Sequence, residues 1–268
     1  MIMAKEKTDI QVQIREGLTI GSDEVVLIAG PCSAESYEQA RRVAQTVAEI
    51  GIKIFRGGAF KPRTSPHAFQ GLGEEGLKIL RDVADEFGLA LVTEALGIEQ
   101  VELVAEYADI IQIGSRNMQH FPLLWAVGEM NKPIMLKRGF MSTVEEWLMA
   151  AEHIANRGNE NIILCERGIR SFDHSTRNVF DTSAIALLKQ ISPYPVIGDP
   201  SHATGRRDLI IPASRAAVAA GADGLMVEFH PKPDEALSDG DQALPLEMLP
   251  QWFEEVGKVA AALGREIS

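Results

Sequence analysis

The chain has 268 residues, of which 46% are hydrophobic and 24% are charged, a composition typical of globular proteins. Its 26 basic and 38 acidic residues give a formal net charge of -12, which excludes general nucleic-acid and anionic-membrane binders, because both partners select for a basic surface. The sequence has no run of 18 apolar residues, no apolar signal-peptide region and only two cysteines, Cys32 and Cys165, and it therefore predicts a cytoplasmic protein.

Short apolar runs alternate with longer segments of helical spacing along the chain. Residues 11–21 come first and predict a small hairpin that turns at Glu16 and Gly17. Eight strands are then predicted at residues 24–30, 52–58, 89–95, 108–114, 132–139, 161–168, 194–201 and 223–231. Helical spacing is clearest at residues 36–50, 74–87, 143–158, 214–222 and 246–264, the last of which contains Pro250, a candidate kink.

This alternation predicts an α/β fold, a (β/α)8 TIM barrel, because each strand is apolar enough to be buried on both faces. A doubly wound open sheet is the alternative, but the turn after the first strand, GPCSAES, is not a glycine-rich dinucleotide loop. We predict one catalytic domain over residues 1–268. Residues 1–22 form an extension whose hairpin caps the bottom of the barrel, and no N-terminal regulatory domain is expected.

Basic residues collect at the carboxyl ends of the predicted strands, where the active sites of barrel enzymes lie. They are Arg56, Lys61, Arg63, Arg116, Lys137, Arg138 and Arg167. For one such residue the simpler interpretation is that the strand ends in solvent there. A whole rim of cations in an acidic protein would repel itself, however, and guanidinium groups favour phosphate and carboxylate. The rim therefore predicts a small substrate with several negative charges.

A second group of candidates could hold a divalent metal ion. The candidates are Cys32 and His202, which follow their strands, Glu228, which lies at the end of its strand, and Asp239, which is in the loop after that strand. These strands are neighbours in a closed barrel. Their mixed sulfur, nitrogen and oxygen donors suit Zn, Fe, Mn or Co better than Mg or Ca. Their spacing matches no short metal motif, and a structural role is the alternative for each; Cys165, inside a strand, is predicted to be core. The residues alone indicate a metal-dependent barrel enzyme that acts on phosphorylated carboxylates or sugars.

Several segments around these residues resemble one enzyme family. They are GPCSAES (30–36), KPRTSPHAFQGLGEEG (61–76), IGSRNMQHFPLL (113–124), LKRG (136–139), CERGIRSFD (165–173), DPSHATGRRDLI (199–210) and GLMVEFHPKPDEALSDGDQAL (224–244). The resemblance is to the 3-deoxy-D-arabino-heptulosonate 7-phosphate (DAHP) synthases, in the barrel-type class shared with the 3-deoxy-D-manno-octulosonate 8-phosphate (KDO8P) synthases. It extends from about residue 20 to residue 260 and implies the same barrel.

The resemblance implies a condensation of phosphoenolpyruvate with erythrose 4-phosphate, the first step of the shikimate pathway, which leads to chorismate and the aromatic amino acids. By the same resemblance the divalent ion falls on Cys32, His202, Glu228 and Asp239. The phosphoenolpyruvate contacts fall on Arg56, Lys61, Arg116, Lys137 and Arg167, and the erythrose 4-phosphate contacts fall on Arg63, Thr64 and Ser65. Lys61, Cys32 and His202 are then the candidate catalytic residues, with Lys61 as the proton donor. The family also implies a homodimer or homotetramer.

Three other functions remain open on the sequence. KDO8P synthases use arabinose 5-phosphate and resemble KANRSS where this chain has KPRTS, so Pro62, Arg63 and Thr64 favour the shorter sugar. A catalytically silent binding protein would not need all four metal-ligand candidates. A metal-dependent aldolase would not need the cationic rim.

Overall fold

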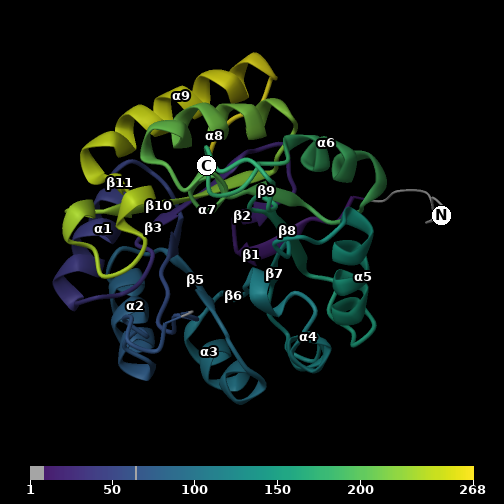
Figure 1. Ribbon diagram of the computed structural model, residues 1–268, viewed down its shortest axis with the longest axis horizontal. Helices are drawn as coiled ribbons and strands as arrows, with labels where there is room; N and C mark the ends of the chain where they lie inside the picture. The colour runs from purple at the N-terminus through teal and green to yellow at the C-terminus, as the bar shows by residue number, and fades with distance from the viewer. Residues whose placement is uncertain (1–8, 64) are drawn as a thin grey trace.

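The computed structural model describes residues 9–63 and 65–268 (Figure 1). The first two strands, β1 (Val12–Arg15) and β2 (Leu18–Ile20), form an antiparallel hairpin at the predicted place. The barrel strands follow in chain order: β3 (Val26–Gly30), β4 (Ile54–Arg56), β5 (Ala90–Glu94), β6 (Ile110–Ile113), β7 (Ile134–Lys137), β8 (Ile162–Glu166), β9 (Val196–Gly198) and β10 (Gly224–His230). A short strand, β11 (Leu244–Pro245), is added beside β10.

The eight strands from β3 to β10 close into a parallel barrel. Each strand pairs with the next one in the chain, and β10 pairs with both β9 and β3. Gly224 lies at this seam, where it is in register with Val26 on one side and Ile197 on the other. A Cβ atom at Gly224 would lie 2.5 Å from the Val26 carbonyl oxygen, so glycine allows the close approach that closes the barrel. The predicted (β/α)8 barrel is confirmed.

Helices surround the barrel as a ring in Figure 1. They are α1 (Tyr37–Glu49), α2 (Glu74–Glu86), α3 (Val101–Tyr107), α4 (Phe121–Gly128), α5 (Val144–Ala155), α6 (Thr182–Ile191), α8 (Ile210–Ala219) and α9 (Leu249–Ala262). The short helix α7 (Pro200–Thr204) lies inside this ring, next to β9. Local sequence fixes several of their starts. Ser36 caps α1 by accepting from the Gln39 N–H, and Thr143 and Glu146 form a reciprocal capping box on α5.

Two helices that have a proline in the first turn, α8 and α9, differ in their limits from the sequence prediction. The helix α8 begins at Ile210, four residues before the predicted start, and Pro212 lies in its first turn. Pro250 neither kinks nor interrupts α9, because it also lies in the first turn, after a short 3-10 turn over Leu246–Met248. Backbone N–H groups in the first turn of a helix have no intrahelical acceptor, so proline loses nothing there.

The alternation of side chains along each strand divides the core into two parts. Phe55, Leu136 and Val227 face outward and pack under the helices, whereas residues such as Met135 and Met226 fill the barrel interior. The hairpin contributes Val12, Leu18 and Ile20 to this interior cluster and lies at the centre of the ring of helices. The predicted cap is therefore a plug whose apolar side chains close one end of the barrel.

Ion pairs identify the end that the hairpin closes. Arg15 of β1 donates two hydrogen bonds, of 3.0 and 2.8 Å, to the carboxylate of Asp109, the residue before β6. Asp109 also accepts from Arg81 and from the Leu91 N–H. The plug therefore covers the amino ends of the strands, and the carboxyl ends remain open.

Candidate active site

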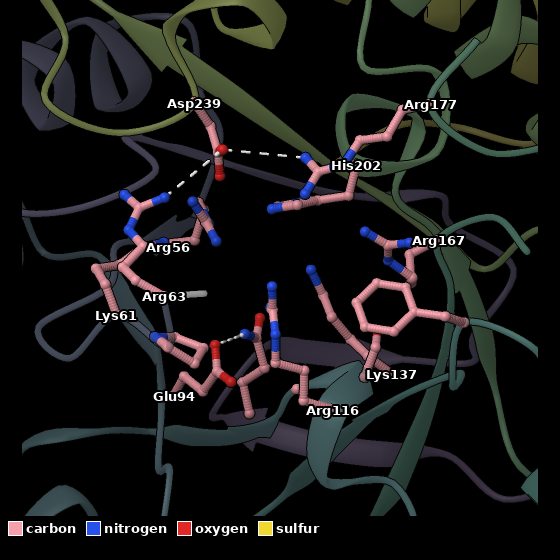
Figure 2. Close-up of a pocket in the computed structure, with 15 residues that line it drawn as sticks. Arg56, Lys61, Arg63, Glu94, Arg116, Lys137, Arg167, Arg177, His202 and Asp239 are labelled. Atoms are coloured by element: carbon pink, nitrogen blue, oxygen red, sulfur yellow. Dashed lines mark hydrogen bonds and ion pairs between the residues drawn. The ribbon is translucent and has the colours of Figure 1, made fainter. Parts of the chain in front are cut away.

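The carboxyl ends of the barrel strands surround a cavity of about 240 Å³ (Figure 2). Its walls come from the ends of strands β4 to β7 and from the segments that follow β4 and β6 to β10. The lining residues are Arg56, Lys61, Pro62, Arg63, Glu94, Gln112, Gly114, Ser115, Arg116, Lys137, Phe140, Arg167, Arg177, His202 and Asp239.

Cations dominate this cavity, although the whole chain is acidic. Seven of the lining residues are arginine or lysine, and only Glu94 and Asp239 carry a carboxylate. Figure 2 shows several of the cationic side chains, including Lys137 and Arg116, extending toward the middle of the cavity. Cations this close repel one another, so the cavity favours a ligand that carries several negative charges.

Two of the cations form buried ion pairs with carboxylates beside the cavity. Arg56 Nη1 lies 2.8 Å from Glu228 Oε1, and Lys137 Nζ lies 2.5 Å from Asp199 Oδ2. Burial alone would raise the pKa of Asp199, but His202 and Lys137 hold this pKa well below its ordinary value. Both pairs fix a cation at the end of a strand, which is the preorganisation that anion binding needs.

Arg116 and Arg167 differ from these cations because neither forms an ion pair within the described residues. Their guanidinium carbons instead lie 5.4 and 4.7 Å from the centre of the Phe140 ring. Burial lowers the pKa of Arg167 to about 10, which leaves the side chain charged at neutral pH. These two residues are cations that a bound anion could neutralise.

A thiol and two carboxylates meet at the β3–β10 side of the cavity. The ligand atoms of Cys32, Glu228 and Asp239 all lie within 4.8 Å of one another. Cys32 Sγ donates to Asp239 Oδ2 over 3.2 Å. Among the described residues, Asp239 is the only non-glycine with a positive φ, at 53°, a strained backbone conformation that places its carboxylate toward the thiol.

His202, the fourth predicted metal ligand, lies beside this group of three. Its Nε2 is 3.3 Å from Glu228 Oε1, and its Nδ1 is 2.6 Å from Asp199 Oδ2. Burial lowers the pKa of His202, which favours the neutral imidazole that metals bind. With Nδ1–H donating to Asp199, the lone pair of Nε2 faces the other candidate ligands.

The chemistry of these four donors fits a divalent transition metal. Burial and the negative charge of Glu228 raise the pKa of the Cys32 thiol to about 12, so the thiolate needs a strong positive partner. Burial alone would also raise the pKa of Asp239, but His202 and Lys61 lower it to about 2. One sulfur, one nitrogen and carboxylate oxygens are a donor set for Zn, Fe, Mn or Co.

Lys61 connects the cysteine with the cationic cavity. Its Nζ lies 3.0 Å from Cys32 Sγ and donates to the Cys32 carbonyl over 3.0 Å, and the side chain also lines the cavity. A Cβ atom at Gly58 would lie 2.9 Å from the Lys61 Cδ, so glycine leaves room for this side chain. Lys61 can therefore give a proton to a substrate bound between the cysteine and the other cations.

The three residues predicted for the sugar phosphate are not all at the cavity. Arg63 lines it, donates to Ser238 Oγ, and has its Nη1 3.8 Å from Asp239 Oδ1. Thr64 lies outside the described residues. Ser65 is exposed and not among the lining side chains, because its hydroxyl accepts from the His67 N–H within its own turn.

One predicted member of the cationic rim lies elsewhere. Arg138 follows Lys137 and points to the opposite face of β7, where its Nη1 contacts both Glu166 and Asp181 at 2.9 Å. The alternation of side chains along a strand explains this, since two consecutive residues cannot both face the barrel interior. Arg138 therefore supports the wall of the cavity from outside and is not part of the rim.

Sequence reasoning also missed some lining residues. Arg177, in the segment between β8 and α6, has its Nη1 4.0 Å from Asp239 Oδ1 (Figure 2). Gln112 donates to Glu94 over 3.0 Å, and Phe140 supplies an aromatic ring. The even spacing of Gln112 from Ile110 could have shown that it faces inward, but no local signal places Arg177, because its position depends on the path of a long loop.

Comparisons with known proteins give a consistent result. A model of the DAHP synthetase I family matches residues 9–263. The chain is 55% identical over 249 residues to phospho-2-dehydro-3-deoxyheptonate aldolase of Thermotoga maritima, a match that covers 93% of this chain and 74% of that protein. It is 35% identical over 259 residues to 2-dehydro-3-deoxyphosphooctonate aldolase of Syntrophotalea carbinolica, covering 90% of this chain and 92% of that protein.

Solved structures are similar to this chain over nearly its whole length. The crystal structure of the Thermotoga maritima aldolase, a DAHP synthase, superimposes with a TM-score of 0.95 at 52% identity and covers 98% of this chain and 77% of that chain. A truncated form of the 3-deoxy-D-arabino-heptulosonate 7-phosphate synthase from the same organism has a TM-score of 0.92 at 49% identity. This match covers 98% of this chain and 96% of that chain.

Proposed function

The chain belongs to the DAHP synthetase I family, and we propose that its cationic cavity is where phosphoenolpyruvate condenses with erythrose 4-phosphate to give DAHP and phosphate. This reaction is the first step of the shikimate pathway. The observation that carries the proposal is the convergence of seven cations and a metal-type donor set at one end of the barrel. Two phosphorylated substrates, one of which is also a carboxylate, have the charge that such a cavity needs.

The phosphoenolpyruvate site consists of Arg56, Lys61, Arg116, Lys137 and Arg167. All five line the cavity, and Arg56 and Lys137 are held by buried carboxylates, whereas Arg116 and Arg167 have no carboxylate partner among residues 9–63 and 65–268. Guanidinium groups bind phosphate and carboxylate with two hydrogen bonds at once, so they fix the orientation of the enol as well as its charge. This orientation exposes one face of the C3 carbon to the aldehyde.

Cys32, His202, Glu228 and Asp239 are the residues that would hold a divalent ion, of which Mn, Fe, Zn and Co fit the donors. When bound, this ion supplies Lewis acidity that polarises the aldehyde carbonyl of the second substrate. His202 is kept in one orientation by Asp199, and Cys32 is kept in place by its contacts with Lys61 and Asp239.

The reaction forms a bond between C3 of phosphoenolpyruvate and the aldehyde carbon of erythrose 4-phosphate. The carbonyl oxygen becomes an alkoxide and takes a proton from Lys61, whose Nζ is 3.0 Å from Cys32 Sγ and so close to the metal-type donors. Water then adds to the cationic C2 and loses one proton, which returns Lys61 to its ammonium form, and a hemiketal phosphate results. The C2–O bond to phosphate breaks, the C2 hydroxyl becomes a carbonyl, and its proton leaves with the phosphate. The proposed sugar-phosphate contacts are Arg63, Thr64 and Ser65, of which Arg63 lies in the cavity.

Phosphate release with two different aldoses tests this function. The purified protein, incubated with phosphoenolpyruvate and a divalent metal ion, is expected to release phosphate with erythrose 4-phosphate. The second candidate substrate is arabinose 5-phosphate, because the chain is also 35% identical to a 2-dehydro-3-deoxyphosphooctonate aldolase. Faster turnover with arabinose 5-phosphate would replace the proposed substrate, and no release with either aldose would refute the reaction.

We also propose that the protein is a cytoplasmic homo-oligomer, a dimer or a tetramer, with one barrel as the catalytic unit of each subunit. None of the helices in residues 9–63 and 65–268 is long and apolar enough to cross a membrane. Both cysteines are free and buried, which suits a reducing compartment. Light scattering on the purified protein tests the oligomeric state, and a mass equal to one 29.3 kDa chain would contradict it.

A further inference from the structure

Three arginine side chains converge on the ring of Phe140. The guanidinium carbons of Arg167, Arg170 and Arg116 lie 4.7, 5.1 and 5.4 Å from its centroid. These residues come from different parts of the chain: Arg116 follows β6, Phe140 follows β7, and the other two follow β8. All three distances are within the range in which a cation is attracted to the negative face of an aromatic ring.

The backbone fixes the place of this ring. The Phe140 carbonyl accepts a hydrogen bond from the Arg170 N–H over 2.7 Å, which ties the loop after β7 to the loop after β8. The Ser142 hydroxyl packs against Gly139, the residue before the ring, where a Cβ atom would lie 2.2 Å from the Ser142 Oγ. Phe140 is half-buried and lines the cavity together with Arg116 and Arg167.

Orienting an arginine with a ring differs in its effect from orienting it with a carboxylate. A carboxylate such as Glu228, which holds Arg56, also neutralises the cation and competes with an incoming anion. An aromatic face restricts the guanidinium group but leaves its charge and its N–H donors available. Within the described residues, Arg116 and Arg167 are oriented by Phe140 and have no ion pair.

From this arrangement we propose that Phe140 is a positioning residue for anion binding, which holds Arg116 and Arg167 in place for phosphoenolpyruvate without neutralising them. It acts through the two arginines and touches none of the reacting atoms. The inference rests on the proposed function in one respect, which is the identity of the anion as phosphoenolpyruvate. The anion-binding part can be tested without any turnover.

The test uses two substitutions at Phe140. Phe140→Leu keeps the apolar bulk and removes the aromatic face, whereas Phe140→Tyr keeps the face. The matched control is Phe172→Leu, the same change at a side chain that is 95% exposed in the segment between β8 and α6. Circular dichroism and the midpoint of thermal unfolding show whether each variant has the wild-type fold.

Isothermal titration with phosphoenolpyruvate alone measures binding, and steady-state kinetics with both substrates measures turnover. We expect Phe140→Leu to weaken phosphoenolpyruvate binding about tenfold and to raise its KM similarly, with little change in kcat or in the KM for erythrose 4-phosphate. Phe140→Tyr and Phe172→Leu are expected to bind within about twofold of wild type.

Wild-type affinity in Phe140→Leu would overturn the proposal. Equal weakening in the leucine and tyrosine variants would also overturn it, since the shape of the side chain and not its aromatic face would then be responsible. If the wild-type protein binds phosphoenolpyruvate but turns over neither aldose, the proposed function fails while the titrations still decide the role of Phe140.

Discussion

Lys137 and Asp199 form a buried ion pair of 2.5 Å that connects the two halves of the candidate site. The same oxygen of Asp199 contacts His202 Nδ1 at 2.6 Å, and the other oxygen accepts a hydrogen bond from the backbone N–H of His202. The Asp199 carboxylate thus orients both Lys137, a proposed contact for phosphoenolpyruvate, and His202, a proposed metal ligand. Substrate binding and metal binding should therefore depend on the same residue.

We predict that Asp199→Asn weakens both metal and phosphoenolpyruvate binding. A residue that hydrogen-bonds to a metal-bound histidine typically contributes about 10- to 100-fold in metal affinity, and an asparagine amide lacks the negative charge that holds Lys137. Competition with a chelator measures the metal affinity, and titration calorimetry measures phosphoenolpyruvate. Asp181→Asn is a matched control, because Asp181 pairs with Arg138 outside the cavity. Unchanged affinities for metal and phosphoenolpyruvate in the Asp199 variant would show that neither depends on Asp199.

We expect exhaustive chelation with EDTA to abolish turnover, and Mn, Fe, Zn or Co to restore it. The reason is the group formed by Cys32, Glu228 and Asp239, with His202 beside it. Cys32→Ala should retain less metal after dialysis, as measured by plasma emission spectroscopy. Cys165→Ala is the control, since Cys165 is buried in the barrel interior and is not a member of that group. Full activity in metal-free protein would contradict the metal site.

Substitutions of two arginines should separate the two substrates. Arg167→Ala is expected to weaken phosphoenolpyruvate binding by about 2–4 kcal/mol, the usual loss for a charge-assisted contact in a desolvated site. Arg63→Ala is expected to raise the KM for erythrose 4-phosphate first, because Arg63 is the proposed sugar-phosphate contact that lines the cavity. Initial rates with each substrate varied in turn measure this difference. The same substrate dependence in both variants would show that the assignment is wrong.

Asp109 should stabilise the fold in a pH-dependent way. Burial alone would raise its pKa, but hydrogen bonds from Arg15, Leu91 and Arg81 lower it below the ordinary value. A carboxyl group whose pKa is lowered by folding stabilises the protein above its unfolded pKa of about 3.9, and this contribution is lost as the pH falls through the folded value. At pH 7 we expect Asp109→Asn to lower the free energy of unfolding by about 2 kcal/mol.

Urea unfolding of the wild type and of Asp109→Asn at pH 7 and near pH 3 measures this effect. The difference between the two proteins should be smaller at the lower pH, where protonation of Asp109 in the unfolded chain removes much of its contribution. A difference that grows as the pH falls would have the wrong sign and would contradict the role given to Asp109.

The sequence by itself determined the barrel, because the pattern that identifies it is local. Each strand is a short apolar run buried on both faces, and each helix has its own spacing and caps, as at Ser36 and Thr143. Barrel active sites lie at the carboxyl ends of the strands, and the sequence places Arg56 and Lys137 there. Both were therefore predicted to belong to one cavity. The predicted limits of α8 were wrong, because the local sequence does not show whether Pro212 lies before the helix or in its first turn.

Tertiary structure decided the features that the local pattern of apolar and polar residues cannot predict. The alternation of side chains along a strand already requires Arg138 to face away from its neighbour Lys137, and the closure of the barrel decided that Glu166 would be its partner. The loop after β8 brought Arg177 to the cavity, and the segments after β6 and β8 brought three arginines to Phe140, which follows β7. These placements depend on the paths of loops and on contacts between residues far apart in the chain. Physically, the period of a helix or strand is set by local backbone geometry, whereas a binding site depends on which strand ends become neighbours when the barrel closes.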